Sequence, residues 1–441
     1  MDWKKHLYRV GSNEWADDDL PTDPKEKPAF EKQCRKHIEP WLSAVFQSEH
    51  LSLLLGSGFT TGVGYIAGSQ ATGMGTTTFG TKFDARIDAH AKKSAEIASR
   101  GEANIEDQLR SALALLEGLN VMQSVSGAKA LRDAINLKLK EFFLSLLATE
   151  RGIAASGNPE KTLLAERYLV SFLMSFASRA ASRERLSIFT TNYDRLIEHG
   201  CDLAGLRLID RFVGALNPVF RSSRIEVDVH YNPPGIRGEP RYLEGVVRLT
   251  KLHGSIDWRL ENRTIRRIGI PFGAPDKHSD VPSAPLETVM IYPNPAKDME
   301  TTEFPYAELF RDFAAAACRP NSVLVTYGYG FGDDHINRVL EDMLTIPSTH
   351  LVIIAHGDTP GRVRNFCEKI GRTAQISILL GSHFGDLTTL VDRYLPKPAI
   401  DYITARKTDL LKNRGEGFAP ADKEDNKKTD GATALTNTGE S

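Results

Sequence analysis

The sequence predicts an α/β protein with a Rossmann-like, doubly wound parallel sheet. Several apolar runs have the length and composition of strands that are buried on both faces. The clearest runs are residues 51–55, 186–189, 246–252, 322–327 and 351–355. Segments with helical spacing separate the runs near both ends of the chain, which is the order expected for a parallel sheet. Four of the runs end in a short polar segment, and ligands bind at the carboxyl ends of strands in such sheets.

Composition restricts the classes of function. The chain has 441 residues and a net charge of −2, so its overall charge does not favour nucleic acid or an acidic membrane as a ligand. Its four cysteines form no Cys-x-x-Cys pair, which argues against a structural zinc site and favours free thiols in a reducing compartment. The sequence shows no signal-peptide core and no apolar run of about 20 residues, so we expect a cytoplasmic protein.

The first 181 residues divide into an arm, a loop and a helical region. Residues 1–30 are expected to form a charged, irregular arm, and residues 30–47 a helix. Residues 62–80 are rich in Gly, Thr and Ser and are expected to form a mobile loop. Residues 85–181 have almost wholly helical spacing and are far longer than a normal crossover, so we predict an inserted helical subdomain.

The remaining chain predicts the rest of the sheet and a tail. The expected elements are a helix over 193–203, a loop over 221–245, irregular chain over 259–285, a strand over 288–292 and an amphipathic helix over 304–317. The expected domains are an N-terminal arm and helix (1–47), the α/β domain (48–84 and 182–395), the helical insertion (85–181) and a C-terminal tail (396–441) that is largely disordered from about residue 408.

Glycine-rich segments follow two of the predicted strands. In residues 56–58 (Gly-Ser-Gly), glycine lets the backbone turn sharply and approach a pyrophosphate. The full Gly-x-Gly-x-x-Gly pattern would need glycine at Thr61, so an ordinary tight turn is an equal alternative. Residues 328–337 alternate glycines with aromatics before Asp333 and Asp334, which are of the type that accepts ribose hydroxyls. A glycine-rich turn capped by Asp at a helix start is the alternative there.

Two further strands end in residues suited to catalysis. Residues 190–194 (Thr-Thr-Asn-Tyr-Asp) include Asn192, whose amide can hold a carboxamide, a ribose hydroxyl or a water. Helix capping by this segment is the alternative. His253 follows another strand, and we expect it to be exposed enough to exchange protons near neutral pH. A lone histidine is more often structural, but its pairing with the Asn192 segment favours a function.

Together these segments resemble the motifs of the sirtuin (SIR2) family, in particular its bacterial SIR2-like branch. Residues 56–60 stand where sirtuins carry Gly-Ala-Gly-x-Ser, and residues 190–194 are similar to Thr-Gln-Asn-x-Asp. Residues 252–254 match the His-Gly of the catalytic histidine. Residues 104–107 (Asn-Ile-Glu-Asp) and 328–337 are similar to motifs of the bacterial branch. The resemblance implies a sirtuin-like fold over roughly residues 45–390.

The chain departs from sirtuin deacylases at several points. Their zinc module with two Cys-x-x-Cys pairs is missing, Thr191 replaces the Gln of their Thr-Gln-Asn motif, and residues 83–86 only loosely match their Asp-Phe-Arg. These departures weaken the case for peptide deacylation. The bacterial resemblance instead implies an NAD+ glycohydrolase that cleaves NAD+ to nicotinamide and ADP-ribose in antiphage defence by NAD+ depletion.

The resemblance also implies roles for individual residues. Asn192 would position the nicotinamide ribose and a water, His253 would act as general base, and Asp194 would support the carboxamide pocket. The residues expected to hold NAD+ are Gly56, Ser57, Gly58, Thr60, Thr190, Gly328, Gly330, Asp333 and Asn337, and no metal is expected.

Partners and alternatives follow from the same resemblance. No Gly-x-x-x-x-Gly-Lys-Thr/Ser motif is present, so we expect a separate partner such as a HerA-type ATPase or a short Argonaute. We also expect the protein to form a homo-oligomer. The loop of residues 62–80 and the helical insertion are expected to gate the site. Two other functions stay open, which are NAD-dependent deacylation or ADP-ribosyl transfer to a protein, and non-enzymatic sensing of NAD+ or ADP-ribose.

Overall fold

A nine-stranded, mostly parallel sheet forms the centre of the protein. The computed structural model describes residues 3–71, 73, 75–97, 102–179, 183–231, 241–262, 264–291, 304–358 and 360–397. Across the sheet the strands follow in the order β2 (Asn13–Asp17), β1 (His6–Val10), β16 (Ile376–Leu380), β15 (His350–Ala355), β14 (Ser322–Tyr327), β3 (His50–Leu55), β4 (Ser187–Thr190), β10 (Val246–Lys251) and β5 (Arg207–Ile209). The strands from β16 to β5 are parallel to their neighbours.

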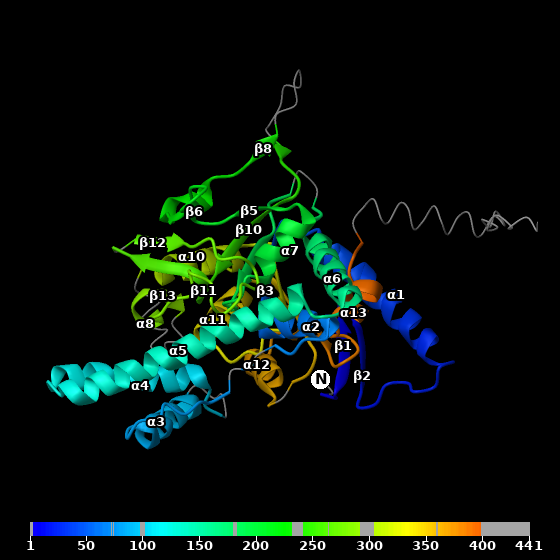
Figure 1. Ribbon diagram of the computed structural model, residues 1–441. Helices are drawn as coiled ribbons and strands as arrows, with labels where there is room; N and C mark the ends of the chain where they lie inside the picture. The colour runs from blue at the N-terminus through cyan, green and yellow to red at the C-terminus, as the bar shows by residue number, and fades with distance from the viewer. Residues whose placement is uncertain are drawn as a thin grey trace, which may run out of the picture. The chain divides into compact units, whose positions relative to one another are not determined.

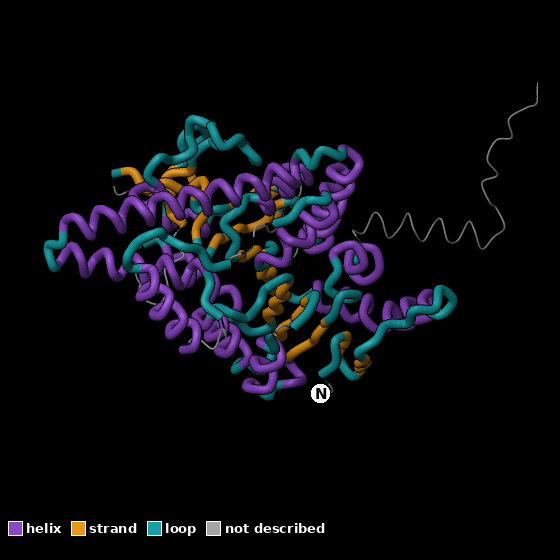
Figure 2. Tube along the Cα trace, turned by 60° about the horizontal axis from the view of Figure 1, so that its bottom comes forward, coloured by secondary structure: helices purple, strands orange, loops and turns teal. Residues whose placement is uncertain are grey.

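The order of the strands confirms the predicted doubly wound α/β class. The chain leaves β3 toward β4 and β10, and later returns to β14 on the other side of β3. The winding therefore reverses between β3 and β14, and ligands bind at such a switch point. Figure 2 shows the strands between helices on both sides.

Alternate residues of each central strand enter two separate cores. In β3, Leu53 and Leu55 pack into one core and Leu54 into the other. The first core is covered by α1 (Lys27–Phe46), α2 (Ser57–Ala67), α6 (Pro159–Ala177), α7 (Leu196–Ala204), α13 (Leu387–Thr389) and η3 (Leu390–Tyr394). The second core is covered by α10 (Tyr306–Ala317), α11 (Asp334–Leu344) and α12 (Arg362–Ile370). Burial on both faces explains why these strands are continuous apolar runs.

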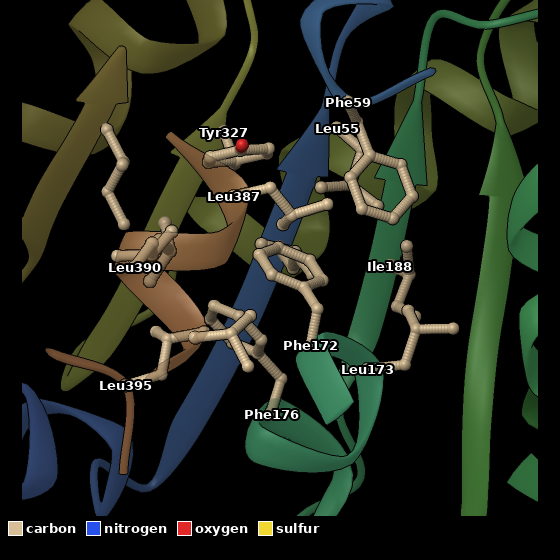
Figure 3. Packing of buried hydrophobic residues seen from close by; sticks show 14 of the residues in the cluster. Leu55, Phe59, Phe172, Leu173, Phe176, Ile188, Tyr327, Leu387, Leu390 and Leu395 are labelled. Carbon is tan, nitrogen blue, oxygen red and sulfur yellow. The ribbon is translucent and has the colours of Figure 1, made fainter. Parts of the chain in front are cut away.

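Helix α6 anchors the glycine segment after β3 to the sheet. The ring of Phe172 in α6 lies 5.0 Å from that of Phe59 and 5.1 Å from that of Tyr327, centroid to centroid (Figure 3). All three side chains are buried, and burying an aromatic side chain of this size stabilises a fold by about 1.5–3 kcal/mol. The predicted helical insertion includes α6, but the buried side chains of this helix belong to the core of the sheet. The exact domain boundaries stay a prediction.

The helical character predicted for the insertion is confirmed. The helices α3 (Asp84–Ile97), α4 (Ile105–Val121) and α5 (Val125–Ala154) lie side by side and extend away from the sheet (Figure 1). Their apolar faces form a third core that also includes Tyr193 and Ile256 of the α/β domain. Helix α4 begins with a capping box, in which the Asn104 side chain accepts from the Asp107 N–H and the Asp107 carboxylate accepts from the Asn104 N–H.

A second, five-stranded sheet is formed by strands from both sides of β10 in the chain. Its order is β13 (Val289–Ile291), β11 (Gly254–Glu261), β12 (Thr264–Arg267), β7 (Val219–Phe220) and β6 (Phe212–Val213). The smaller elements are a strand pair of β8 (His230–Tyr231) and β9 (Arg241–Tyr242), the short helix α8 (Pro285–Thr288), and the turns η1 (Ser222–Glu226) and η2 (Thr373–Gln375). The interpretation of residues 259–285 as irregular is therefore wrong at its start, where β11 and β12 form a hairpin.

Two other local predictions are wrong. The N-terminal arm is not irregular, because β1 and β2 extend the main sheet in antiparallel pairing and Leu7 and Tyr8 enter opposite cores. Residues 62–67 are helical, since α2 continues to Ala67 and ends at Gly68 in a left-handed conformation. The expected disordered tail lies outside the described residues from residue 398 on. Among the described helices, none combines the length and the apolar character that crossing a membrane requires.

Candidate functional site

A cavity of about 360 Å³ opens at the carboxyl ends of β3, β4, β10 and β14. Of the predicted site residues, those that line it are Gly56, Ser57, Thr60, Asn192, Asp194, His253, Gly330 and Asp333. The others, which are Gly58, Thr190, Gly328 and Asn337, are not part of the lining. The structure thus brings together residues from all four polar segments, although the sequence separates them by up to about 280 positions.

The glycines at the switch point serve close packing of the backbone. The Gly58 N–H donates to the Gly328 carbonyl at 3.0 Å. A Cβ at Gly56 would lie 2.4 Å from the Gly328 oxygen, and one at Gly58 would lie 2.7 Å from its Cα. Gly328 has a φ of +65°, which side chains disfavour. Gly58 and Gly328 therefore join the two strand ends behind the cavity, whereas we predicted that they contact NAD+ directly.

A buried hydrogen-bond network fixes the orientation of Asn192. Its Nδ2 donates to the Gly56 carbonyl and to the Thr60 Oγ1, each at 3.0 Å, and Thr60 donates to the Asp194 carboxylate at 2.8 Å. Because a carbonyl oxygen can only accept a hydrogen bond, the donating amide nitrogen of Asn192 must face Gly56. Oδ1 is then the amide atom left for a ligand. Thr190 supports this loop from behind, since its Oγ1 donates to the Leu55 carbonyl and accepts from the Asn192 N–H.

Asp194 lines the cavity and also supports the start of α7. Its Oδ1 accepts from the Leu196 N–H at 3.1 Å at the start of α7, while its Oδ2 accepts from Thr60. The N-cap residue of α7 is Arg195, which makes no side-chain capping bond, so Asp194 supports the start of the helix from the position before the cap. Asn337 is also structural, because its side chain accepts from the Tyr329 hydroxyl and donates to the Phe331 carbonyl.

His253 is paired with a second histidine that sequence reasoning missed. The two Nε2 atoms of His253 and His335 lie 3.2 Å apart, and a carboxylate oxygen of Asp333 lies within 4.8 Å of a ring nitrogen of each histidine. The expectation of an exposed His253 is wrong, since the residue is 5% exposed and reaches the cavity rather than open solvent. The only sequence signal for His335 was its place in the segment 328–337, where it had no assigned role.

The helical insertion supplies the opposite wall of the cavity. Asn104 and Glu106 at the start of α4 and Leu146 and Thr149 in α5 line it. Glu106 accepts a hydrogen bond from the Tyr193 hydroxyl at 3.2 Å, and burial raises the pKa of that hydroxyl well above its usual value. Sequence reasoning noticed residues 104–107 but assigned them no contact.

A buried ion pair holds the insertion to the Asn192 loop. Glu150 of α5 is fully buried and accepts from Arg195 through the backbone N–H at 2.9 Å, through Nε at 3.1 Å and through a terminal nitrogen at 2.5 Å. The Gly273 N–H donates to the same carboxylate at 3.1 Å. Arg195 also donates to the carbonyls of Ile270 and Pro271. No sequence pattern indicated this pair.

Comparison with known proteins supports the architecture. Residues 186–374 match the family model of the SIR2-like domain, and no curated protein matches the chain. The matched region contains Asn192, His253 and the segment 328–337, but not the glycine segment after β3. SIR2-like proteins use NAD+. The four cysteines are free, and the described residues show no cysteine-based zinc module.

Proposed function

We propose that this protein hydrolyses NAD+ to nicotinamide and ADP-ribose. The observation that carries the proposal is the convergence of an oriented Asn192 amide and His253 on one cavity at the switch point of a SIR2-like fold. A cavity at this point of a doubly wound sheet is the usual place for a dinucleotide. Conversion of NAD+ without an acceptor then requires only that water reach the nicotinamide ribose.

The phosphates of NAD+ would lie at the start of α2. Gly56 is the N-cap of this helix, and Ser57 and Thr61 line the cavity beside it. The N-terminal end of a helix carries a partial positive charge that favours anions. Arg362 of α12 also lines the cavity and adds a full positive charge, a contribution that sequence reasoning did not find.

The part of the cavity that holds the nicotinamide ribose would promote cleavage by positioning the substrate and stabilising charge, more than by supplying a strong nucleophile. Cleavage of the bond between nicotinamide and ribose leaves positive charge on the ribose, and the cavity lining includes the carboxyl groups of Glu106, Asp194 and Asp333. Asn192 Oδ1 would hold a ribose hydroxyl or the attacking water. His253 would accept the proton from that water or hydroxyl, and general-base help of this kind is typically worth ~100- to 10,000-fold.

The biological role is proposed from the sequence resemblance. We infer that NAD+ depletion serves antiphage defence in the cytoplasm, and that a homo-oligomer is activated by a separate partner such as a HerA-type ATPase or a short Argonaute. The insertion supports the idea of control, because it forms one wall of the cavity. A rearrangement of this wall would open or close the site.

The test is chromatography of NAD+ incubated with the purified protein, alone and with its partner. Hydrolysis predicts nicotinamide and ADP-ribose without any acceptor. Nicotinamide that appears only with an acylated peptide or an acceptor protein would replace the proposal with deacylation or ADP-ribosyl transfer. Saturable NAD+ binding without product under both conditions would make the protein a sensor.

A further inference from the structure

Three side chains with metal-ligating atoms meet at the wall of the cavity. They are His253 at the end of β10, and Asp333 and His335 at the start of α11. Each offers one ligand atom, and the three atoms all lie within 4.8 Å of one another. His253 and Asp333 line the cavity, so an ion held here would be accessible from it.

The spacing of the two imidazoles fits a shared metal ion. Two Zn–N bonds of about 2.0–2.1 Å at a tetrahedral angle place their nitrogens roughly 3.3–3.4 Å apart. The observed separation of the two Nε2 atoms is 3.2 Å. A simple hydrogen bond between two neutral imidazoles also gives this distance. The carboxylate of Asp333, within 4.8 Å of a ring nitrogen of each histidine, is the second observation, because it completes a three-ligand set that a hydrogen bond does not require.

The surroundings hold the two rings in place. The ring of His335 lies 4.7 Å from that of Phe310, and the ring of His253 lies 6.2 Å from that of Tyr193. Tyr193 is itself held by its hydrogen bond to Glu106. Rings that are already oriented lose little freedom when they bind an ion, as is general for metal ligands that are fixed by their neighbours.

We propose that His253, His335 and Asp333 bind a zinc-class divalent ion, and that the bound ion inhibits the enzyme. Two imidazoles and one carboxylate suit Zn2+ or Co2+ and are a poor set for Mg2+ or Ca2+, which prefer oxygen ligands. A fourth position would remain toward the cavity for water or a ligand. An ion bound to the Nε2 of His253 uses the lone pair that would otherwise accept a proton. The inhibitory half of this inference rests on the proposed function.

The site is tested by titrating the metal-free full chain with CoCl2 and then ZnCl2. We expect one Co2+ per chain with the visible bands of a four- or five-coordinate site, displaced by one equivalent of Zn2+. His335→Ala removes one of three ligands, so it should weaken Zn2+ binding by at least ~10- to 100-fold, the loss typical even of outer-shell changes. Asp333→Asn should also weaken it.

The matched control is His278→Ala. His278 Nδ1 lies 3.6 Å from the Asp280 carboxylate, so this variant removes a His–Asp pair outside the cavity. Its Zn2+ affinity should equal that of the wild type. Equal affinities in His335→Ala and the wild type, or Co2+ bands typical only of the hexaaqua ion, would overturn the site.

A second measurement uses the wild type and avoids variants that fail to fold. Bound Zn2+ should protect His253 and His335 from modification by diethyl pyrocarbonate, as mapped by mass spectrometry, while His278 stays reactive. Equal modification of His253 and His335 with and without Zn2+ would contradict the proposal.

Inhibition is measured separately from binding. Stoichiometric Zn2+ should stop nicotinamide release and EDTA should restore it. Undiminished release with Zn2+ bound would overturn the inhibition alone. If the protein releases no nicotinamide at all, the proposed function fails while the Co2+ spectrum still decides the metal site.

Discussion

The two walls of the cavity are held in different ways. The wall at the strand ends is fixed by short local contacts, which are the glycine packing of Gly56, Gly58 and Gly328 and the Asn192–Thr60–Asp194 hydrogen bonds. The wall from the helical insertion belongs to a separate core of α3, α4 and α5. It contributes Asn104, Glu106, Leu146 and Thr149 to the lining.

Residues 192–195 join the two walls, because successive side chains of this segment form hydrogen bonds to one wall and then the other. Asn192 and Asp194 make their hydrogen bonds toward the sheet, whereas Tyr193 and Arg195 make theirs to Glu106 and Glu150 of the insertion. Any movement of α4 or α5 therefore acts directly on the segment that carries Asn192. This arrangement gives a physical basis for the expected gating by the insertion.

Removing the reacting groups of the sheet wall should have the largest effect. Asn192→Ala and His253→Ala should each lower the rate of NAD+ hydrolysis by ~100- to 10,000-fold, since each removes a positioned group that is used in the transition state. Rates come from nicotinamide release and folding from circular dichroism. Asn120→Ala, at an exposed position of α4, is the control and should keep the wild-type rate. A variant at Asn192 or His253 that also kept this rate would contradict the assignment.

Breaking the buried ion pair between Glu150 and Arg195, which joins the two walls, should have the second largest effect. Glu150→Ala leaves Arg195 buried without its carboxylate, which typically costs about 3–5 kcal/mol of unfolding free energy. We also expect slower turnover, because Arg195 follows the Asn192 loop. Urea unfolding measures the first effect.

The control for the Glu150–Arg195 ion pair is a second glutamate of the same helix, α5. Glu141→Ala removes an exposed pair with Lys138, and such pairs are worth about 0–1 kcal/mol. Equal stability losses in Glu141→Ala and Glu150→Ala would show that the buried pair does not hold the walls together.

Disturbing the glycine packing should lower the unfolding free energy by less than breaking the buried ion pair does. Gly328→Ala puts a Cβ 2.5 Å from the Phe59 nitrogen at a positive φ, so we expect a loss of about 1–3 kcal/mol in unfolding free energy. Gly330→Ala is the matched control, because its Cβ meets nothing within 4 Å. Thermal melts of the two variants should differ clearly, and identical melting temperatures would refute the role given to Gly328.

Removing one hydroxyl between the walls should have the smallest effect. Tyr193→Phe loses the hydrogen bond to Glu106, which is worth about 0.5–1.5 kcal/mol, and should slow NAD+ hydrolysis. Tyr168→Phe loses a similar bond to Asp392 at 2.7 Å, and Tyr168 lies outside the cavity, whereas Tyr193 lines it. Only Tyr193→Phe should change the rate. An equal rate change in both variants would remove the special role of Tyr193.

The sequence predicted the sheet wall better than the insertion wall for a physical reason. Strands buried on both faces leave long apolar runs, and the polar segments directly after them mark one edge of the sheet. The short strands β1 and β2 leave no such run and were missed. Residues 62–67 contain two glycines, which lower helix propensity, so the sequence predicts a loop where the structure has a packed helix.

Contacts between distant segments were beyond any local pattern. Glu150 and Arg195 are ordinary charged residues in the sequence, and only the packing of α5 against the Asn192 loop makes them a buried pair. His335 was visible inside a glycine-rich segment, but its approach to His253 depends on how β10 and α11 lie in the fold. The sequence therefore predicts a role for His253 but not its pairing with His335.

The most direct test of the account compares the wild type with Asn192→Ala on NAD+ alone. Nicotinamide and ADP-ribose are measured by chromatography under the conditions in which the wild type is active. We predict equal molar amounts of the two products from the wild type and at least a ~100-fold slower release from Asn192→Ala. Equal rates from the two proteins, or nicotinamide without ADP-ribose, would contradict an Asn192-dependent NAD+ hydrolase.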